Sequence, residues 1–136
     1  MITVFITGAT GTMGHQGLVE LLAHKKEFDY NIRVLARKSK KNIELLAPIV
    51  SDIDIVWGDL TCYEDVLRGV TGSDVVLHVG GMVSPQADYR PRATFRTNIT
   101  AAENIRKAVL AQGDVQPRVV YTMLDSCRYV GHVIYF

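Results

Sequence analysis

The sequence predicts an α/β fold in which a doubly wound parallel sheet of about five strands is covered by helices on both faces. Two observations lead to this prediction. Short runs rich in β-branched residues alternate along the chain with longer stretches in which apolar residues recur at helical spacing. The strand runs are almost uninterrupted apolar segments, as expected for strands that helices bury from both sides. Because a helix separates each strand from the next, right-handed crossovers should join them in parallel.

The strands are predicted from five short apolar runs. In chain order they read ITVFIT at residues 2–7, IRVLA at 32–36, IDIVW at 53–57, DVVLHV at 74–79 and RVVYT at 118–122. Most are rich in valine and isoleucine, whose branched side chains favour extended backbone. We expect the sheet to stop after the fifth run, so that the outer edge of this strand lacks a neighbour.

Four helices are predicted between these strands. They cover residues 12–25, 40–50, 63–68 and 93–111. Apolar side chains recur every three or four residues in the first of them. The second should stop near Pro48, because proline cannot continue a helix, and Gly113 closes the last.

Composition limits the function further. The chain has 136 residues, with 15 basic against 14 acidic side chains, so its net charge of +1 argues against nucleic acid as the main partner. We expect no membrane association, because no apolar run approaches the roughly 20 residues that cross a bilayer. Cys62 and Cys127 have neither CxxC spacing nor neighbouring histidine pairs. We therefore expect no metal site and no disulfide scaffold, and a protein of the reducing cytoplasm.

The most informative motif is TGATGTMG, which runs from residue 7 to residue 14 between the first strand and the first helix. In this context Gly8 would let the chain turn off the strand, and Gly11 would let the backbone approach a pyrophosphate. Gly14 would let the helix pack closely on the sheet. The helix N-terminus would offer N–H groups to the phosphates. The motif favours a dinucleotide site over the alternative, a glycine-rich turn without a ligand.

Several segments together resemble the short-chain dehydrogenase/reductase superfamily, specifically its extended branch of NAD(P)-dependent epimerases, dehydratases and reductases. They are the GxxGxxG spacing of the glycine loop, the turn GDL at residues 58–60, DVVLHVGG at 74–81 and TNITAAENI at 97–105. In the last segment Asn98 and Asn104 match the family pattern, whereas Ala101 and Ala102 replace its usual Gly-Thr. The resemblance covers residues 2–122 and implies the N-terminal, cofactor-binding part of such a protein.

The end of the second strand indicates which nicotinamide cofactor is bound. An acidic residue there would hold the ribose 2′-hydroxyl of NAD and repel a 2′-phosphate. This chain has Ala36 at that place, followed by Arg37 and Lys38. A guanidinium holds a phosphate through two N–H groups, so we expect NADP as the cofactor, with NAD as the alternative.

The resemblance and the glycine loop together give a set of candidate cofactor-binding residues. These are Gly8, Thr10, Gly11, Thr12, Met13, Gly14, Arg37, Lys38, Asp59, Leu60, Val79, Gly80, Gly81 and Asn98. The acidic turn at Asp59 would lie beside the adenine ring. His78 lies in the fourth strand, where the family often has a histidine without a chemical part.

The catalytic residues of the superfamily are only partly accounted for. Members use a Ser or Thr, a Tyr and a Lys, with the tyrosine as general acid and base. No Tyr-x-x-x-Lys follows the fifth strand, since Val133 stands four residues after Tyr129. Ser126 is the candidate for the serine, although counting from the fifth strand places that position at residues 123–124.

Two kinds of function remain open. The first is the NADP-binding part of an epimerase, dehydratase or carbonyl reductase with a small-molecule substrate, inactive as this short chain. The second is a non-catalytic NAD(P)-binding module or redox sensor. We expect residues 1–122 to form the NAD(P)-binding domain, and the resemblance implies a homodimer through the helix at 93–111. Residues 123–136 would be an atypical tail, explained by a shifted reading frame, a natural short variant or a cut gene model.

Overall fold

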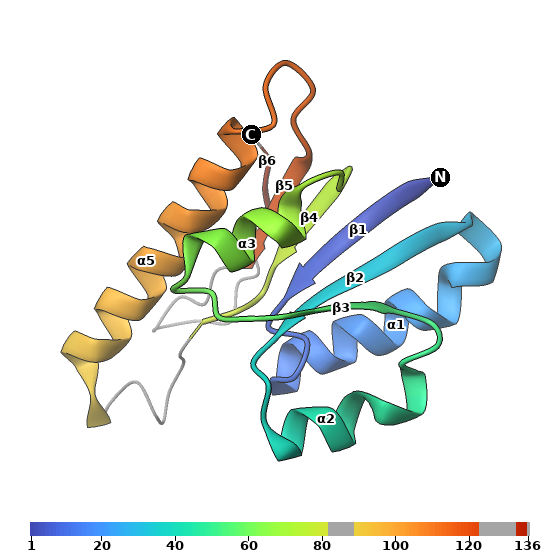
Figure 1. Cartoon of the computed structure of the whole chain (residues 1–136), viewed down its shortest axis with the longest axis horizontal. Coiled ribbons are helices and arrows are strands. Elements are labelled where there is room, and N and C mark those ends of the chain that lie inside the picture. Colours follow the sequence, from blue (N-terminus) through green and yellow to red (C-terminus); the bar gives the residue numbers. More distant parts are fainter. Residues whose placement is uncertain (82–88, 123–132, 136) are drawn as a thin grey trace.

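The computed structural model describes residues 1–81 and 89–122 and the backbone of 133–135, and in these it has one sheet flanked by helices (Figure 1). The strands are β1 (Ile2–Thr7), β2 (Tyr30–Ala36), β3 (Asp54–Trp57), β4 (Val75–His78), β5 (Arg118–Thr122) and β6 (Val133–Tyr135). The helices are α1 (Thr12–Phe28), α2 (Lys40–Leu46), the 3-10 turn η1 (Ala47–Ile49), α3 (Tyr63–Val70) and α5 (Pro91–Leu110).

The strand order is β3-β2-β1-β4-β5-β6, and the first five strands of this order are parallel, as predicted. The expectation that the outer edge of β5 lacks a neighbour was wrong. β6 pairs with it antiparallel, with Tyr121 opposite Ile134. The pairing gives the backbone N–H and C=O groups of the β5 edge partners that an unpaired edge strand would lack. The sheet is therefore parallel over β1–β5 and mixed only at this edge.

Local backbone chemistry explains where the helices end. α1 runs to Phe28, and its C-cap Asp29 adopts the left-handed conformation (φ 47°) before β2 begins. The second predicted helix is shorter than expected, because α2 ends at Leu46 and the chain continues as a 3-10 turn that contains Pro48. Over the described ranges, no helix is both long enough and apolar enough to span a membrane.

Strand alternation divides the core into two layers (Figure 1). On one face, Phe5 of β1 packs with Val66 of α3 and Ile105 of α5. On the other face, the next residue of β1, Ile6, packs with Leu18 of α1 and with α2. Successive side chains of a strand point to opposite faces, so a buried parallel strand must be apolar at every position. This packing holds the carboxyl ends of the strands, where the candidate site lies, in fixed relative positions.

Candidate cofactor-binding site

The candidate site lies at the carboxyl ends of β1 and β4, where the strand order reverses direction (Figure 1). Thr7 of β1 is paired in register with His78 of β4. β1 lies at the centre of the order, with β2 and β3 on one side and β4 and β5 on the other. In open α/β sheets such a reversal leaves a crevice outside the strand ends, which is where ligands bind.

Two of the three glycines in the loop after β1 are required by the protein itself. Gly8 has φ +75°, and a Cβ there would lie 2.6 Å from both Cα and N of Gly80. A Cβ on Gly14 would overlap the carbonyl group of Gly8. These two positions exclude side chains because other backbone approaches too closely: the chain after β4 lies against Gly8, and the loop after β1 lies against Gly14.

Gly11 is different, because nothing among the described residues excludes a side chain there. Its backbone is extended (φ −86°, ψ 173°), and its nearest Cβ contact would be the carbonyl oxygen of Gly8 at 3.4 Å, an ordinary distance. Gly11 is exposed and forms the N-cap of α1 without a side-chain hydrogen bond, and the first turn carries no acidic residue. The surface above it is thus backbone at a helix N-terminus, which is suited to an anion.

A buried hydrogen-bond network ties the ends of β1 and β4 together. The hydroxyl oxygen of the fully buried Thr7 accepts the N–H of Gly80 at 3.1 Å. The same oxygen lies 2.8 Å from Nδ1 of His78 in a hydrogen bond. Burial lowers the pKa of His78 from 6.5 to about 4, so this imidazole is neutral at pH 7. The network fixes the backbone of Gly80 against the glycine loop.

The turn after β3 is held by two carboxylates. Asp59 accepts hydrogen bonds from the N–H (2.8 Å) and the hydroxyl (2.7 Å) of Thr61, and these lower its pKa. Asp65 of α3 accepts the N–H of Asp59 at 2.9 Å, which lowers the pKa of Asp65. A Cβ on Gly58 would overlap the Asp65 side chain, so glycine is needed there. The turn is a preformed structure whose acidic group is ionised at pH 7.

Asn104 of α5 connects this turn to the opposite side of the site. Its buried side chain donates from Nδ2 to the carbonyl of Leu60 at 2.8 Å. The Leu60 side chain in turn packs against Gly80, where a Cβ would overlap it. Asn98, six residues earlier on α5, lies beside Gly81, where a Cβ would lie 3.2 Å from its Oδ1. Asn104 was predicted only as a family match, and nothing in its local sequence indicates its partner 44 residues away.

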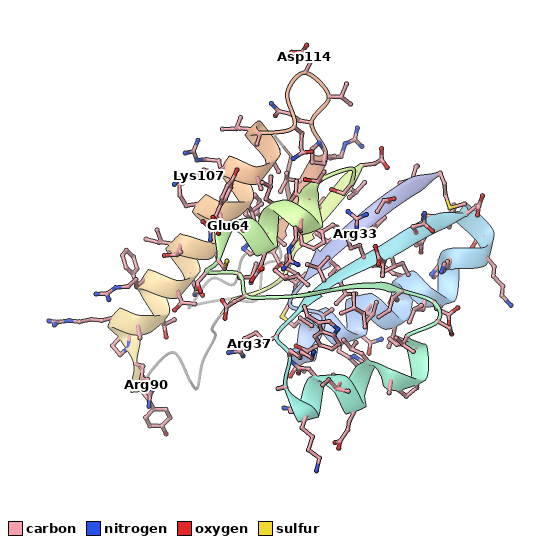
Figure 2. All side chains as sticks on the ribbon, viewed as in Figure 1. Arg33, Arg37, Glu64, Arg90, Lys107 and Asp114 are labelled. Atoms are coloured by element: carbon pink, nitrogen blue, oxygen red, sulfur yellow. The ribbon has the colours of Figure 1, made fainter. Side chains whose placement is uncertain are left out.

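The basic pair follows β2 at the same edge of the sheet. Ala36 is buried at the end of the strand, whereas Arg37 and Lys38 are exposed. Figure 2 shows Arg37 projecting from the loop between β2 and α2. The charge of Arg37 contributes to the lowered pKa of Asp59, which places the guanidinium within electrostatic reach of the turn after β3.

The structure thus gathers the predicted cofactor-binding residues at one edge of the sheet. They come from the loops after β1, β2, β3 and β4 and from α5. Thr10 is half-buried, Thr12 and Met13 are exposed in the first turn of α1, and Val79 is half-buried between His78 and Gly80. The catalytic candidate Ser126 lies outside the described residues.

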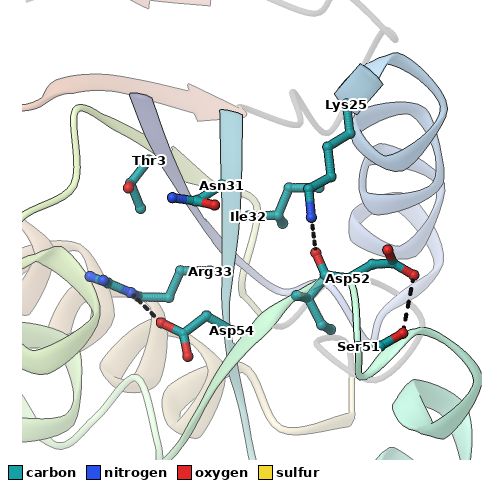
Figure 3. A pocket seen from close by; sticks show the side chains of 9 residues that line it. Thr3, Lys25, Asn31, Ile32, Arg33, Ser51, Asp52 and Asp54 are labelled. Carbon is teal, nitrogen blue, oxygen red and sulfur yellow. Dashed lines mark hydrogen bonds and ion pairs between the residues drawn. The ribbon is translucent and has the colours of Figure 1, made fainter. Parts of the chain in front are cut away.

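Two hollows in the described part of the chain lie at the opposite edge of the sheet. One of about 350 Å³ opens at the amino ends of β1, β2 and β3 (Figure 3). Its charged groups are already engaged, since Lys25 donates to the carbonyl of Asp52 at 2.6 Å and Arg33 pairs with Asp54 at 3.2 Å. Arg33 also donates to the carbonyl of Thr71 at 2.7 Å. This hollow is a polar seam between elements, remote from the glycine loop.

The sheet order and the glycine loop define a Rossmann-type domain. The chain belongs to the NAD-dependent epimerase/dehydratase family, whose pattern it matches over residues 4–132. The resemblance drawn from the sequence is therefore confirmed. The chain is 29% identical over 109 residues to a UDP-glucose 4-epimerase of Rickettsia bellii (strain RML369-C), which covers 78% of the chain and 32% of the relative. It is 25% identical over 130 residues to the 3 beta-hydroxysteroid dehydrogenase type 7 of Mus musculus, which covers 96% of the chain and 34% of the relative.

The chain spans about a third of the length of these curated relatives. Among solved structures, Pen from Bacillus thuringiensis superposes with a TM-score of 0.75 at 30% identity, over 89% of this chain and 36% of that one. UDP-glucose 4-epimerase from Bifidobacterium longum, solved in complex with NAD+ and UDP, superposes with a TM-score of 0.68 over 88% of this chain and 36% of that one. At 19% identity the second likeness supports the fold alone.

Proposed function

We propose that this chain binds NADP as the cofactor-binding part of an epimerase, dehydratase or carbonyl reductase. The observation that carries the proposal is the contrast among the loop glycines. Gly8 and Gly14 are required by backbone contacts, whereas Gly11 is a glycine that the fold itself does not need. An exposed glycine at a helix N-terminus, beside the switch point of the sheet, suits the approach of a pyrophosphate.

The residues present fit a dinucleotide, and each contributes a distinct interaction. The loop backbone and the N-terminus of α1 would hold the pyrophosphate, while the turn at Asp59 and Leu60 would border the adenine. The Thr7–His78 network would keep Gly80 and Gly81 in place under the nicotinamide half. Once bound, the nicotinamide supplies a hydride donor or acceptor to a carbonyl or alcohol substrate.

The preference for NADP over NAD rests on the end of β2. Ala36 offers no carboxylate to repel a 2′-phosphate, and Arg37 supplies an exposed guanidinium at the same edge. The 2′-phosphate thus meets no repelling carboxylate and is attracted by a guanidinium, so both effects favour the phosphorylated cofactor.

Catalysis is the point on which the two functional hypotheses differ. The sequence contains no Tyr-x-x-x-Lys after the fifth strand, so a general base of the family type is missing from these residues. This favours binding without turnover by the 136-residue chain itself, as a cofactor-binding part or as a non-catalytic module. We further propose a small-molecule substrate for the whole protein, a homodimer through α5 and a cytoplasmic location.

Titration of the chain with NADPH and NADH, followed by nicotinamide fluorescence, tests the cofactor proposal. We expect tighter binding of NADPH, and Arg37→Ala should remove most of the preference. A charge-assisted contact is worth about 1.5–3 kcal/mol, which corresponds to roughly a tenfold to hundredfold change in Kd. Equal affinities for the two cofactors would contradict the assignment of NADP.

A matched pair of loop variants tests the site. Gly11→Val should abolish binding of both cofactors while circular dichroism and thermal unfolding stay near wild type. Gly14→Ala should instead lower the thermal stability, because its Cβ overlaps the Gly8 carbonyl. If Gly11→Val still binds cofactor, the loop is only structural.

A turnover assay separates the two hypotheses. NADPH oxidation by the 136-residue chain should stay at background across a panel of carbonyl compounds. An extended protein with a family-like C-terminal half after Thr122 should show hydride transfer. Steady turnover by the short chain would mean that another residue supplies the proton.

A further inference from the structure

We propose that Asn42 is a positioning residue for cofactor selectivity, because its side-chain amide fixes the backbone from which Arg37 projects. This inference rests on the proposed binding of NADP. Asn42 lies in the first turn of α2, and its side chain is buried, with 9% of the residue exposed. It is the buried polar residue of the loop and helix that follow β2.

Three hydrogen bonds hold this loop. Nδ2 of Asn42 donates to the carbonyl of Arg37 at 2.8 Å, and the N–H of Asn42 donates to the hydroxyl of Ser39 at 3.2 Å. One residue earlier, the carbonyl of Ala36 accepts the N–H of Gly58 at 3.0 Å. The peptide groups on both sides of the Arg37 Cα are therefore anchored, one to the turn after β3 and the other to α2.

The chemistry of the first turn of α2 requires an amide for this contact. Ser39 is the N-cap, and Asn42 occupies the third helical position. Glutamate or glutamine often stands at this position and accepts the N–H of the cap residue. A carboxylate cannot donate to a carbonyl oxygen, whereas the Asn42 amide can donate to that of Arg37.

Anchoring matters because arginine has many rotamers and an exposed loop has many backbone conformations. Fixing the backbone before binding lowers the entropy that a phosphate contact must overcome. NADPH and NADH differ at the 2′-phosphate. A loss of anchoring at Arg37 should therefore weaken the binding of NADPH and leave the binding of NADH nearly unchanged. Loss of a residue that merely supports the fold would weaken the binding of both cofactors by the same factor.

The test measures the ratio of NADH to NADPH dissociation constants for the wild-type chain, Asn42→Ala and Ser39→Ala. The second variant is a matched control, because it removes the cap of α2 but leaves the amide on the Arg37 carbonyl. Asn42→Ala should lower the ratio by roughly threefold to tenfold, a part of the worth of one charge-assisted contact. Ser39→Ala should keep the ratio within about twofold of the wild type.

The outcomes are distinguishable. A wild-type ratio near one overturns the NADP assignment and this inference with it. The role of Asn42 alone is overturned if the wild type prefers NADPH and Asn42→Ala leaves that preference intact. It is also overturned if Asn42→Ala lowers the affinity for both cofactors equally. If Ser39→Ala lowers the ratio as much as Asn42→Ala does, the effect belongs to the start of α2 as a whole, and the specific role of the Asn42 amide is overturned. Asn42→Leu, which keeps the number and branching of the side-chain heavy atoms without the amide, repeats the measurement if the alanine variant unfolds.

Discussion

The stability of this chain should fall as pH drops below 6.5 because of one buried histidine. His78 is 7% exposed and hydrogen-bonded to Thr7, and its ring meets that of Tyr121 edge-on at 5.3 Å. Burial lowers its pKa to about 4, whereas the unfolded chain has the ordinary value of 6.5. Between these values the unfolded state binds a proton that the folded state excludes, so acid favours unfolding.

The size of the effect follows from the two pKa values. The folded state is at full stability above pH 6.5, loses stability as pH falls, and reaches its full loss below about pH 4. A difference of about 2.5 units corresponds to roughly 3 kcal/mol in total. About 2 kcal/mol of this should already be lost between pH 7.5 and pH 5. The lowered pKa values of Asp59 and Asp65 act in the same direction, but only near and below their ordinary value of 3.8.

Urea unfolding at pH 7.5, 6.0 and 5.0 measures this dependence. His78→Gln keeps a hydrogen-bonding side chain without titrating, so the free energy of unfolding should change with pH by about 2 kcal/mol less than in the wild type. His24→Gln is the matched control, because His24 is exposed on α1. The reasoning fails if wild type and His78→Gln lose the same free energy, or if the His24 variant produces the difference.

Two further predictions concern packing and the turn after β3. Gly69→Ala should destabilise the chain by about 1–3 kcal/mol because its Cβ would overlap the ring of Phe5, whereas Gly17→Ala should stabilise it by up to about 1 kcal/mol. Thermal unfolding of the two variants checks this, and equal effects would contradict it. Asn104→Ala should lower the free energy of unfolding by about 1–2 kcal/mol, because it removes the donor to the Leu60 carbonyl. It should also weaken the binding of NADPH and NADH alike. Urea unfolding with cofactor titration checks this, and unchanged binding would show that the contact does not shape the site.

The sequence by itself predicted the alternation of strands and helices along the chain, the parallel direction of the strands and the place of the glycine loop. These features depend on residues that are close in the chain. The period of apolar residues decides between strand and helix, and TGATGTMG combines a strand end, a turn and a helix start within eight residues. β6 was missed because three residues of an apolar tail give no periodicity, and their pairing depends on the free edge of β5.

Only the tertiary structure distinguished the roles of the individual site residues. The three loop glycines look alike in sequence, yet Gly8 is required by Gly80 of another strand end, while Gly11 meets no such contact. Thr7 and His78 are 71 residues apart and share a hydrogen bond because β1 and β4 are neighbours in the sheet. Asn104 reaches the Leu60 carbonyl for the same kind of reason. Sequence spacing encodes contacts along the chain, whereas contacts between loops depend on which strands lie side by side, and that is settled when the sheet assembles.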